Sequence, residues 1–340
     1  MTTSLKVLFI TDRSPRHQQD ALAVAPPECR VVMLRNPDRA TLLAEIADAE
    51  VLVSERAGEI DATLIAAAPR LRLIQRLGSL THDIDLAAAR QAGVAVSAWP
   101  VVGCVMVAEH MLLQMLALAR HLPESVAIAH AAADWGQEPR RTDENVFAYN
   151  WSARRTLTSL WDANVGILGF GEIGAELARR LKGFVPAAVR YHKRRRLPKT
   201  VEAELGITYT TPDEIVTTSD FLCVLLPYMA ETDMSLNAAT FAAMKPGSFV
   251  VHCGSGSVLD EAALAAAVAS GHLGGAALDT FEWEPLRPDN PLLAAALDPA
   301  LNVVLTPHTG AAGGRGDGRA SDWANIRLLL AGEPLRYRVV

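Results

Sequence analysis

The sequence predicts an α/β protein with parallel sheets and more than one domain. Short apolar runs alternate along the chain with Ala- and Leu-rich segments of helical period, which is typical of parallel strands joined by crossover helices. The chain has 340 residues, more than one hydrophobic core usually serves. Of these, 50% are hydrophobic and 21% are charged, as in a globular protein with a sizeable core. We therefore expect two domains.

Ten apolar runs are the expected strands. In chain order they are 7–11, 30–34, 51–54, 71–77, 94–97, 164–169, 187–192, 221–226, 248–253 and 302–306. A long helix is expected over residues 102–122, between the fifth and sixth runs, and a polar loop follows it. We place one domain boundary near Pro100. The chain is expected to cross between the two domains a second time after Pro307, where a Gly-rich segment (310–318) leads into a helix over 321–332.

Several classes of protein are not favoured by the sequence. The first apolar run is cut off by Asp12 and Arg13, which indicates a buried strand and not a signal peptide. No stretch approaches the apolar length of a membrane helix, so we expect no membrane association. A net charge of −6 does not favour nucleic acid as a partner. The cysteines lack paired spacing, which favours reduced thiols in a cytoplasm over disulfides or a metal site; they are Cys29, Cys104, Cys223 and Cys253.

A G-x-G-x-x-G motif follows the sixth apolar run and precedes an amphipathic segment. Gly169 permits a tight turn, Gly171 lets the backbone approach a pyrophosphate, and Gly174 lets the helix pack against its strand. The phosphates would lie at the positive end of the helix dipole. We therefore expect a dinucleotide cofactor to contact this loop, whose residues are Gly169, Phe170, Gly171, Glu172, Ile173 and Gly174.

The next run ends in a concentration of positive charge. The nine residues from Val189 to Leu197 include six basic side chains, namely Arg190, His192, Lys193, Arg194, Arg195 and Arg196. NAD-binding proteins place an acidic residue at the end of this strand to hold the ribose hydroxyls, and here that position is His192. His192, Lys193 and Arg194 would attract a 2′-phosphate, so the sequence predicts a preference for NADP over NAD. For Arg195 and Arg196 we expect solvated charges.

Four landmarks resemble the D-isomer-specific 2-hydroxyacid dehydrogenase family over nearly the whole chain. They are GFGEIG (169–174); LLPYMAET (225–232) with MKPG (244–247); HCGSGSVLDEAAL (252–264) with ALDTFEWEP (277–285); and LTPHTG (305–310). The resemblance implies a Rossmann dinucleotide-binding domain (101–308) inserted into a flavodoxin-like substrate domain (1–100 and 309–340), both with parallel sheets. It also implies a small-molecule substrate and a homodimer joined through the cofactor domains.

The resemblance further implies a set of site residues. His308 matches the general acid that protonates the ketone oxygen as hydride reaches the carbon, and Glu284 matches the carboxylate bonded to that histidine. A carboxylate partner fixes the tautomer of an imidazole and favours its charged form. Asp279 matches a residue near the nicotinamide carboxamide. Further expected cofactor contacts, several of them lining the nicotinamide ribose, are Leu226, Pro227, Cys253, Gly254 and Gly310.

The chain departs from the family pattern around the substrate. Ser255 stands where the family has an arginine that clamps the substrate carboxylate and polarises the carbonyl. In the substrate-domain loop GSLTHDID, Leu80 and His82 replace a glycine and an aspartate. Ala98 replaces a common asparagine. We expect Ser255 to take part in the reaction site and expect the loop to contact the substrate through Ser79, Leu80 and Thr81. The reaction type is therefore better indicated than the substrate.

Three functions remain open from the sequence. The first is an NADP-dependent oxidoreductase that interconverts a ketone and a secondary alcohol with His308 and Glu284. The second is an enzyme of the same fold in which bound NADP serves a non-redox or transiently redox reaction, such as a lyase or hydratase. The third is a protein that senses NADP(H) without turnover. Retention of both His308 and Glu284 argues against a sensor, whereas Ser255 leaves it possible.

Overall fold

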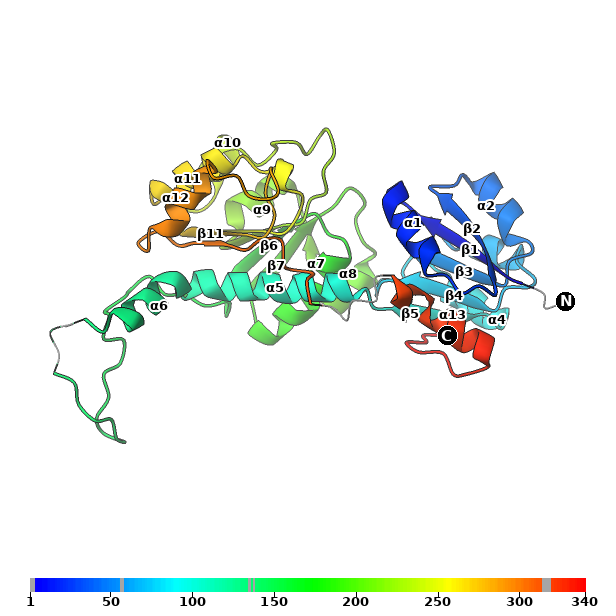
Figure 1. Ribbon diagram of the computed structural model, residues 1–340, viewed down its shortest axis with the longest axis horizontal. Helices are drawn as coiled ribbons and strands as arrows, with labels where there is room; N and C mark the ends of the chain where they lie inside the picture. The colour runs from blue at the N-terminus through cyan, green and yellow to red at the C-terminus, as the bar shows by residue number, and fades with distance from the viewer. Residues whose placement is uncertain (1–3, 56–57, 134–135, 137, 314–318) are drawn as a thin grey trace. The chain divides into compact units, whose positions relative to one another are not determined.

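The computed structural model describes residues 4–55, 58–133, 136, 138–313 and 319–340. The chain divides into two compact units (Figure 1). Unit 1 consists of Met1–Gly103 and Gly313–Val340, and unit 2 consists of Cys104–Ala312. Each unit contains one sheet, and every strand pair in both sheets is parallel. The predicted α/β class with parallel sheets is therefore confirmed.

Unit 1 has a five-stranded sheet in the order β2-β1-β3-β4-β5, which is the flavodoxin-like order. The strands are β1 (Leu5–Thr11), β2 (Cys29–Arg35), β3 (Val51–Glu55), β4 (Leu73–Leu77) and β5 (Ala95–Trp99). One face packs against α2 (Arg39–Ile46), α3 (Ala62–Ala66) and α4 (Leu86–Gln91). The other face packs against α1 (Pro15–Ala23), η3 (Ala320–Trp323) and α13 (Ala324–Ala331). The C-terminal segment thus completes the core that the N-terminal strands begin.

Unit 2 has a seven-stranded sheet in the order β12-β11-β10-β9-β6-β7-β8. The order reverses between β6 and β9, as in dinucleotide-binding Rossmann sheets. The strands are β6 (Asn164–Leu168), β7 (Ala188–His192), β8 (Thr208–Tyr209), β9 (Phe221–Val224), β10 (Phe249–His252), β11 (Gly275–Leu278) and β12 (Val303–Leu305). The helices are α5 (Val102–Ala119), α6 (Leu122–Ala131), α7 (Glu172–Leu181), η1 (Lys182–Phe184), α8 (Lys199–Leu205), α9 (Pro212–Thr218), α10 (Ala238–Ala243), η2 (Gly256–Val258), α11 (Glu261–Ala269) and α12 (Pro291–Leu297).

The two faces of this sheet are covered by different helices. Leu222 and Val224 of β9 join a core with Ile215 of α9, Phe241 of α10, Leu264 of α11 and Leu292 of α12. Cys223 points to the opposite face, because side chains alternate along a strand, and its sulfur lies 3.8 Å from that of Met115 in α5. Figure 1 shows α5 running along this second face.

All ten expected runs contain strands, but two strands were not predicted. β8 is a two-residue strand at the edge of the sheet, too short to leave a pattern. β11 lies between β10 and β12, yet its sequence, GAAL, has no β-branched or aromatic residue. Its small side chains are fully buried because the sheet is covered on both faces. The strand preferences of its residues therefore did not indicate that β11 is a strand.

The long helix was predicted over 102–122, but it ends at Ala119. His121 has φ 46°, a left-handed conformation, and α6 starts after it. The expectation that no stretch approaches a membrane helix in length was also wrong: α5 has 18 residues with a mean hydropathy of 1.7. Half of this helix is buried within the protein, and Asn302 donates to the carbonyl of Leu118 (2.8 Å). Its apolar surface therefore serves the core of unit 2.

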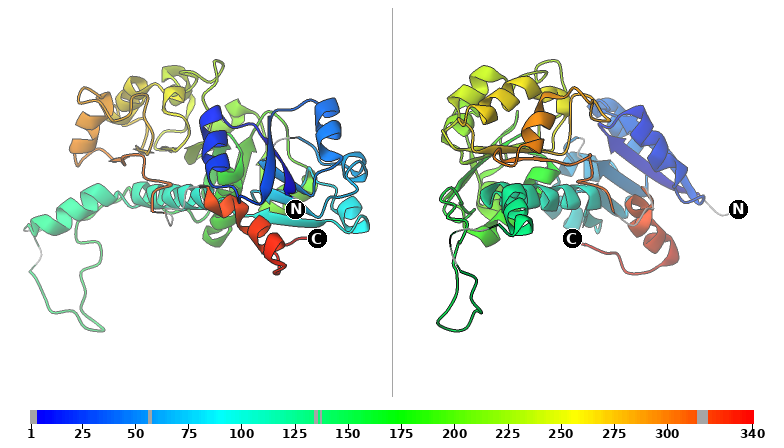
Figure 2. Two further views of the ribbon diagram at one scale, coloured as in Figure 1. Left: turned by 45° about the vertical axis from the view of Figure 1, so that its right-hand side comes forward. Right: turned by 60° about the vertical axis from the view of Figure 1, so that its left-hand side comes forward.

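A long arm leaves α5 and returns to it. The arm comprises α6 and the described residues from 138 to 157, and Thr158 N–H then donates to the carbonyl of Ala119 (2.9 Å). None of the α6 residues is buried. Figure 2 shows α6 and the segment after it extending away from the rest of unit 2 in both views. Phe147 and Tyr149 on this arm are 70% and 87% exposed.

Candidate active site

The sequence-predicted residues of unit 2 gather at the carboxyl ends of its parallel strands. Gly169 follows β6, Leu226 and Pro227 follow β9, Cys253 follows β10, and Asp279 follows β11, while His308 comes shortly after β12. Neighbouring parallel strands bring these ends to one edge of the sheet, which is where open α/β folds bind ligands.

The glycine loop brings two strand ends into close approach. Gly169 has φ 84°, and a Cβ there would lie 2.6 Å from the carbonyl carbon and oxygen of Leu225. A Cβ on Gly254 would likewise lie 2.7 Å from the carbonyl oxygen of Leu226. Only glycine fits at both positions, so the backbone segments after β6 and β10 pack closely against the segment that follows β9.

Helix α7 begins directly after the segment that contains Gly169, with Gly171 as its N-cap. Its first intrahelical bond runs from Ala175 N–H to the carbonyl of Gly171 (3.0 Å), so the preceding N–H groups have no intrahelical partner. Phe170 and Glu172 are buried, and Ile173 is partly buried. Gly174 was predicted to let the helix pack against its strand. A Cβ added at this position would instead lie 3.0 Å from the ring of Phe170, in the loop after the strand. A glycine loop at a helix N-terminus fits the pyrophosphate of a dinucleotide.

His192 lies beside the glycine loop. It is the last residue of β7 and pairs with Leu168 of β6, and its carbonyl accepts from Gly169 N–H (3.1 Å). The Nδ1 atom of His192 lies 2.9 Å from the carbonyl oxygen of Thr210. Because a carbonyl only accepts, the proton must be on Nδ1. This contact fixes the orientation of the ring, which also lies 5.4 Å from the ring of Tyr209.

The remaining basic residues divide into two groups. Arg190 donates to Asn164 Oδ1 (3.0 Å), and Arg196 donates two bonds to Glu202, of 2.7 and 2.8 Å. The expectation of a solvated charge was therefore wrong for Arg196. Lys193 is partly buried, whereas Arg194 and Arg195 are exposed. Among the described residues no ion-pair partner is found for Arg194 or Arg195, so neither guanidinium group is held by a carboxylate of the protein.

The Arg196–Glu202 pair joins α8 to the segment that follows β7. Glu202 is buried and also accepts from the Tyr191 hydroxyl (3.0 Å), and that hydroxyl accepts from Leu197 N–H (2.9 Å). The guanidinium of Arg196 lowers the pKa of the Glu202 carboxyl from 4.5 to about 2. Arg196 is thus a structural residue that fixes the segment on which Lys193, Arg194 and Arg195 lie.

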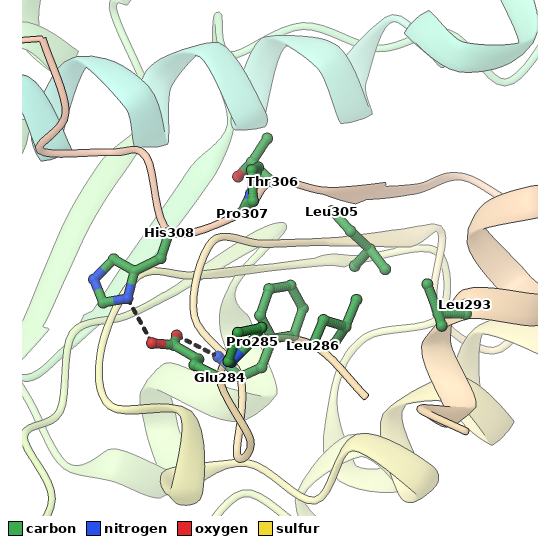
Figure 3. Close-up of a pocket in the computed structure, with 9 residues that line it drawn as sticks. Glu284, Pro285, Leu286, Leu293, Leu305, Thr306, Pro307 and His308 are labelled. Carbon is green, nitrogen blue, oxygen red and sulfur yellow. Dashed lines mark hydrogen bonds and ion pairs between the residues drawn. The ribbon is translucent and has the colours of Figure 1, made fainter. Parts of the chain in front are cut away.

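His308 and Glu284 form a close pair. His308 Nδ1 lies 2.7 Å from Glu284 Oε2, and Glu284 Oε1 accepts from Phe281 N–H (3.1 Å) (Figure 3). The side chains are 57% and 36% exposed. The Glu284–Pro285 peptide bond is cis. Since a carboxylate only accepts, Nδ1 carries a proton, and Figure 3 shows the other ring nitrogen pointing away from Glu284.

An apolar pocket is lined by the His308–Glu284 pair together with Thr306 and a group of apolar side chains. Its volume is about 590 Å³, and its apolar walls are Phe281, Pro285, Leu286, Leu293, Leu305 and Pro307. Figure 3 shows Leu286, Leu293 and Leu305 on the side of Glu284 away from the imidazole, and Pro307 next to His308.

Asp279 is buried, and the protein itself supplies its hydrogen-bond donors. Its Oδ1 accepts from the hydroxyl of Thr306 (2.6 Å) and from Thr309 N–H (2.9 Å). Its Oδ2 accepts from Gly310 N–H (2.7 Å). The structure thus gives Asp279 a role that the sequence did not suggest, which is to hold the residues immediately after His308.

Cys253, Gly254 and Ser255 follow β10 in order. Cys253 donates to Gln114 Oε1 (3.4 Å), and burial raises the pKa of its thiol well above the usual range, so it is a neutral group. Ser255 is half-buried, and its N–H donates to the carbonyl of Leu226 (2.9 Å). Within the described residues no group of three or more His, Cys, Asp or Glu side chains could hold a metal ion.

Sequence reasoning missed His252, which precedes Cys253. Its side chain is fully buried, and neither ring nitrogen has a hydrogen-bond partner among the described residues. Burial lowers its pKa to about 4, so it is neutral at pH 7. Its place at the end of a central strand was visible in the sequence, but its burial was not.

The predicted substrate loop belongs to unit 1. Ser79, Leu80 and Thr81 follow β4 and are half-buried. Arg76, at the end of β4, is 2% exposed and donates to Asp83 Oδ1 (2.6 Å). This partly buried ion pair, which the sequence did not predict, joins the two ends of the loop.

The family of the protein follows from comparison with known sequences. Residues 112–310 match the model of the NAD binding domain of D-isomer specific 2-hydroxyacid dehydrogenases. The chain belongs to this family. It is similar to D-3-phosphoglycerate dehydrogenase of Mycobacterium tuberculosis, with 32% identity over 97% of this chain and 58% of that one. It is also similar to glyoxylate reductase of Pyrococcus furiosus, with 32% identity over 82% of this chain and 78% of that one.

The fold is also similar to that of solved structures. The TT0316 protein from Thermus thermophilus is 28% identical, covers 99% of this chain and has a TM-score of 0.53. The PH0520 protein from Pyrococcus horikoshii is 26% identical, covers 98% of this chain and has a TM-score of 0.58. In each case the match covers 95% or more of the solved chain. By contrast, the chain spans 58% of the length of the phosphoglycerate dehydrogenases that it matches. The resemblance inferred from the sequence motifs is confirmed.

Proposed function

We propose that the protein is an NADP-dependent oxidoreductase that interconverts a ketone and a secondary alcohol. The observation that carries the proposal is the 2.7 Å contact between His308 Nδ1 and Glu284 Oε2, in the unit that also contains the glycine loop. Unit 2 is proposed to bind the cofactor, since its glycine loop after a central strand and at the N-terminus of α7 fits a dinucleotide. Unit 1 is proposed to contribute Ser79, Leu80 and Thr81 to substrate binding.

His308 is proposed as the general acid in reduction and the general base in oxidation. Reduction of a ketone requires a proton on oxygen when hydride reaches the carbon, and the nicotinamide supplies the hydride when bound. Glu284 accepts from Nδ1, so Nε2 is the atom that delivers the proton. The same carboxylate stabilises the imidazolium before transfer. His308 is 57% exposed, so the proton can be replaced from solvent between turnovers.

Cofactor choice is proposed to follow from the end of β7. His192 replaces the carboxylate that would repel a 2′-phosphate, and its backbone lies beside the glycine loop. Lys193 and Arg194 come directly after it, and Arg194 is exposed. Charge-assisted bonds from these residues to a phosphate would favour NADP over NAD.

The substrate is proposed to differ from a simple 2-keto acid in how it is held. Ser255 offers a hydroxyl but no charge, so it cannot clamp a carboxylate as a guanidinium does. A substrate with hydroxyl or amide groups near Ser255, or with its acidic group held elsewhere, fits this residue better. The same substitution would suit an enzyme in which NADP is reduced only transiently, which is a second candidate function.

Absorbance of the reduced nicotinamide tests this proposal. Purified protein is incubated with NADPH and a panel of ketones and keto acids, and with NADP⁺ and the matching alcohols, with His308→Ala as the control. Net consumption of NADPH by the wild type alone supports the oxidoreductase. Product formation without net consumption supports the transiently redox reaction. Tight NADPH binding with no product from any substrate would contradict both and indicate a sensor.

We also propose that the protein is a homodimer joined through unit 2 and that it works in the cytoplasm on a small molecule. The exposed aromatic side chains of the arm favour a partner surface. All four cysteines are free, which suits a reducing compartment. The net charge of −6 gives no reason to expect nucleic acid as a partner.

A further inference from the structure

A second polar cluster lies directly behind the loop of His308. It consists of Asp279, Thr306, His110 and Gln114, and we call it the Asp279 cluster. Asp279 follows β11, Thr306 follows β12, and the other two residues lie about one turn apart on α5. Thr306 Oγ1 is the centre, at 2.6 Å from Asp279 Oδ1, 2.9 Å from His110 Nε2 and 3.3 Å from Gln114 Nε2.

The donors and acceptors of this cluster are fixed by chemistry. A carboxylate only accepts, so the single proton of the Thr306 hydroxyl is donated to Asp279. The hydroxyl oxygen then accepts from Gln114 and from His110, which places a proton on His110 Nε2. The same His110 nitrogen lies 3.4 Å from Asp279 Oδ1. Helix α5 therefore supplies two donors that hold the hydroxyl on the carboxylate.

The carboxylate in turn holds the backbone on one side of His308. It accepts from the N–H groups of Thr309 (2.9 Å) and Gly310 (2.7 Å). On the other side, His308 N–H donates to the carbonyl of Thr306 (2.9 Å). A Cβ on Gly310 would lie 2.8 Å from Asp279 Oδ2, so the close approach needs glycine.

His308 itself has an uncommon backbone conformation. Its φ is 52°, in the left-handed region that residues other than glycine rarely adopt. Such conformations persist where the surroundings over-determine them. The bonds before and after His308 all lead to Thr306 or to Asp279, so the Asp279 cluster provides that constraint.

We infer that Thr306 and His110 are positioning residues for His308. Thr306 links the helix donors to the Asp279 carboxylate, and the carboxylate sets the backbone that presents the imidazole to Glu284. This inference rests on the proposed role of His308 as the acid. Its test therefore includes a measurement that does not depend on turnover.

The first measurement is the rate of amide hydrogen exchange at Thr309 and Gly310, which is detected by NMR on the full chain. Thr306→Val removes the hydroxyl at nearly constant shape, and His110→Leu removes the ring donor. Thr306→Ser and His110→Gln are the matched controls, because each keeps the donor or acceptor. Loss of one such bond corresponds to about tenfold faster exchange at these two amides. The controls should stay within about threefold of the wild type, as should the amides of β11 in every variant.

The second measurement separates kcat from KM. If His308 loses its position, Thr306→Val lowers kcat by about tenfold or more, while KM for NADPH changes by less than about threefold. Thr306→Ser should restore kcat. Unchanged exchange at Thr309 and Gly310 in both Thr306→Val and His110→Leu would overturn the inference, as would faster exchange with wild-type kcat. Failure of the proposed function would be seen separately, as a wild type that never consumes NADPH, and the exchange result would still decide whether the cluster positions His308.

Discussion

At the scale of single residues, the His308–Glu284 pair carries the proposed chemistry and gives the first prediction. His308→Ala should lower kcat by about 10² to 10⁴-fold, the usual contribution of a general acid. Glu284→Gln should lower it as well, because a neutral amide cannot stabilise the imidazolium. Fluorescence titration should give NADPH affinities close to the wild type for both variants, since neither side chain belongs to the glycine loop. Near wild-type turnover of the true substrate by His308→Ala would show that another group is the acid.

Ser255 gives the second prediction. A guanidinium facing a carboxylate offers two charged bonds, so its absence should reduce kcat/KM for small 2-keto acids by about tenfold to several hundredfold. The wild type should therefore reduce glyoxylate or hydroxypyruvate poorly. Ser255→Arg should raise that activity and lower activity on the natural substrate, because the new charge would lie unpaired against a neutral group. Ser255→Lys is the control for charge without the bidentate geometry. Efficient glyoxylate reduction by the wild type would mean that another cation replaces the arginine.

A third prediction concerns stability at low pH and belongs to Glu202. Its pKa is lowered from 4.5 to about 2, so its ionised form stabilises the folded state above pH 4.5. That contribution should be lost as the pH falls from about 4.5 to about 2. Urea unfolding at several pH values should give a free energy of unfolding that falls more steeply in this window for the wild type than for Glu202→Gln. Equal slopes would show that Arg196 does not depress the pKa of this carboxyl.

Contacts between single side chains show which parts of the site could not be predicted from the sequence. The motifs placed His308 and Glu284 24 residues apart, and the structure brings them to 2.7 Å. The Arg196–Glu202 bond was not predicted, because an acidic partner on the following helix becomes a neighbour only after the chain turns. The same holds for Arg76 with Asp83 and for His110 with Thr306. Side-chain pairs across elements depend on packing, which local patterns do not encode.

At the scale of elements, the strands were largely predictable. Apolar runs indicate buried parallel strands wherever branched and aromatic residues fill them, as in β1 and β6. β11 was not predicted, because burial on both faces makes GAAL a strand although its residues have low strand propensity. The end of α5 was also predicted at the wrong residue. Its helical pattern continues to residue 122, whereas the left-handed conformation of His121 breaks the helix. In both cases tertiary context overrides the local preference.

The end of β7 gives the fourth prediction. Replacing Lys193 and Arg194 together by alanine should weaken NADPH binding by about tenfold to a hundredfold and leave NADH binding nearly unchanged, because the lost bonds go to the 2′-phosphate. Added salt should weaken NADPH binding by the wild type more than by the variant. Arg195→Ala is the matched control, since we expect a solvated charge there. Equal affinity of the wild type for NADPH and NADH, in fluorescence titrations, would contradict this assignment of the basic run.

At the scale of the whole molecule, the arm of unit 2 gives the last prediction, a homodimer. Light scattering at micromolar concentration should give twice the 36.5 kDa of one chain. Phe147 and Tyr149 expose large apolar surface on a segment that extends from its own unit, and burial of each such side chain stabilises an interface by roughly 1.5–3 kcal/mol. Phe147→Asp with Tyr149→Asp should therefore raise the dissociation constant by about a hundredfold or more. Leu297→Asp is the control, because Leu297 is 82% exposed at the end of α12, outside the arm, and its variant should remain a dimer. A wild type that stays monomeric at high micromolar concentration would contradict the dimer, and a double variant with unchanged affinity would exclude the arm as its contact.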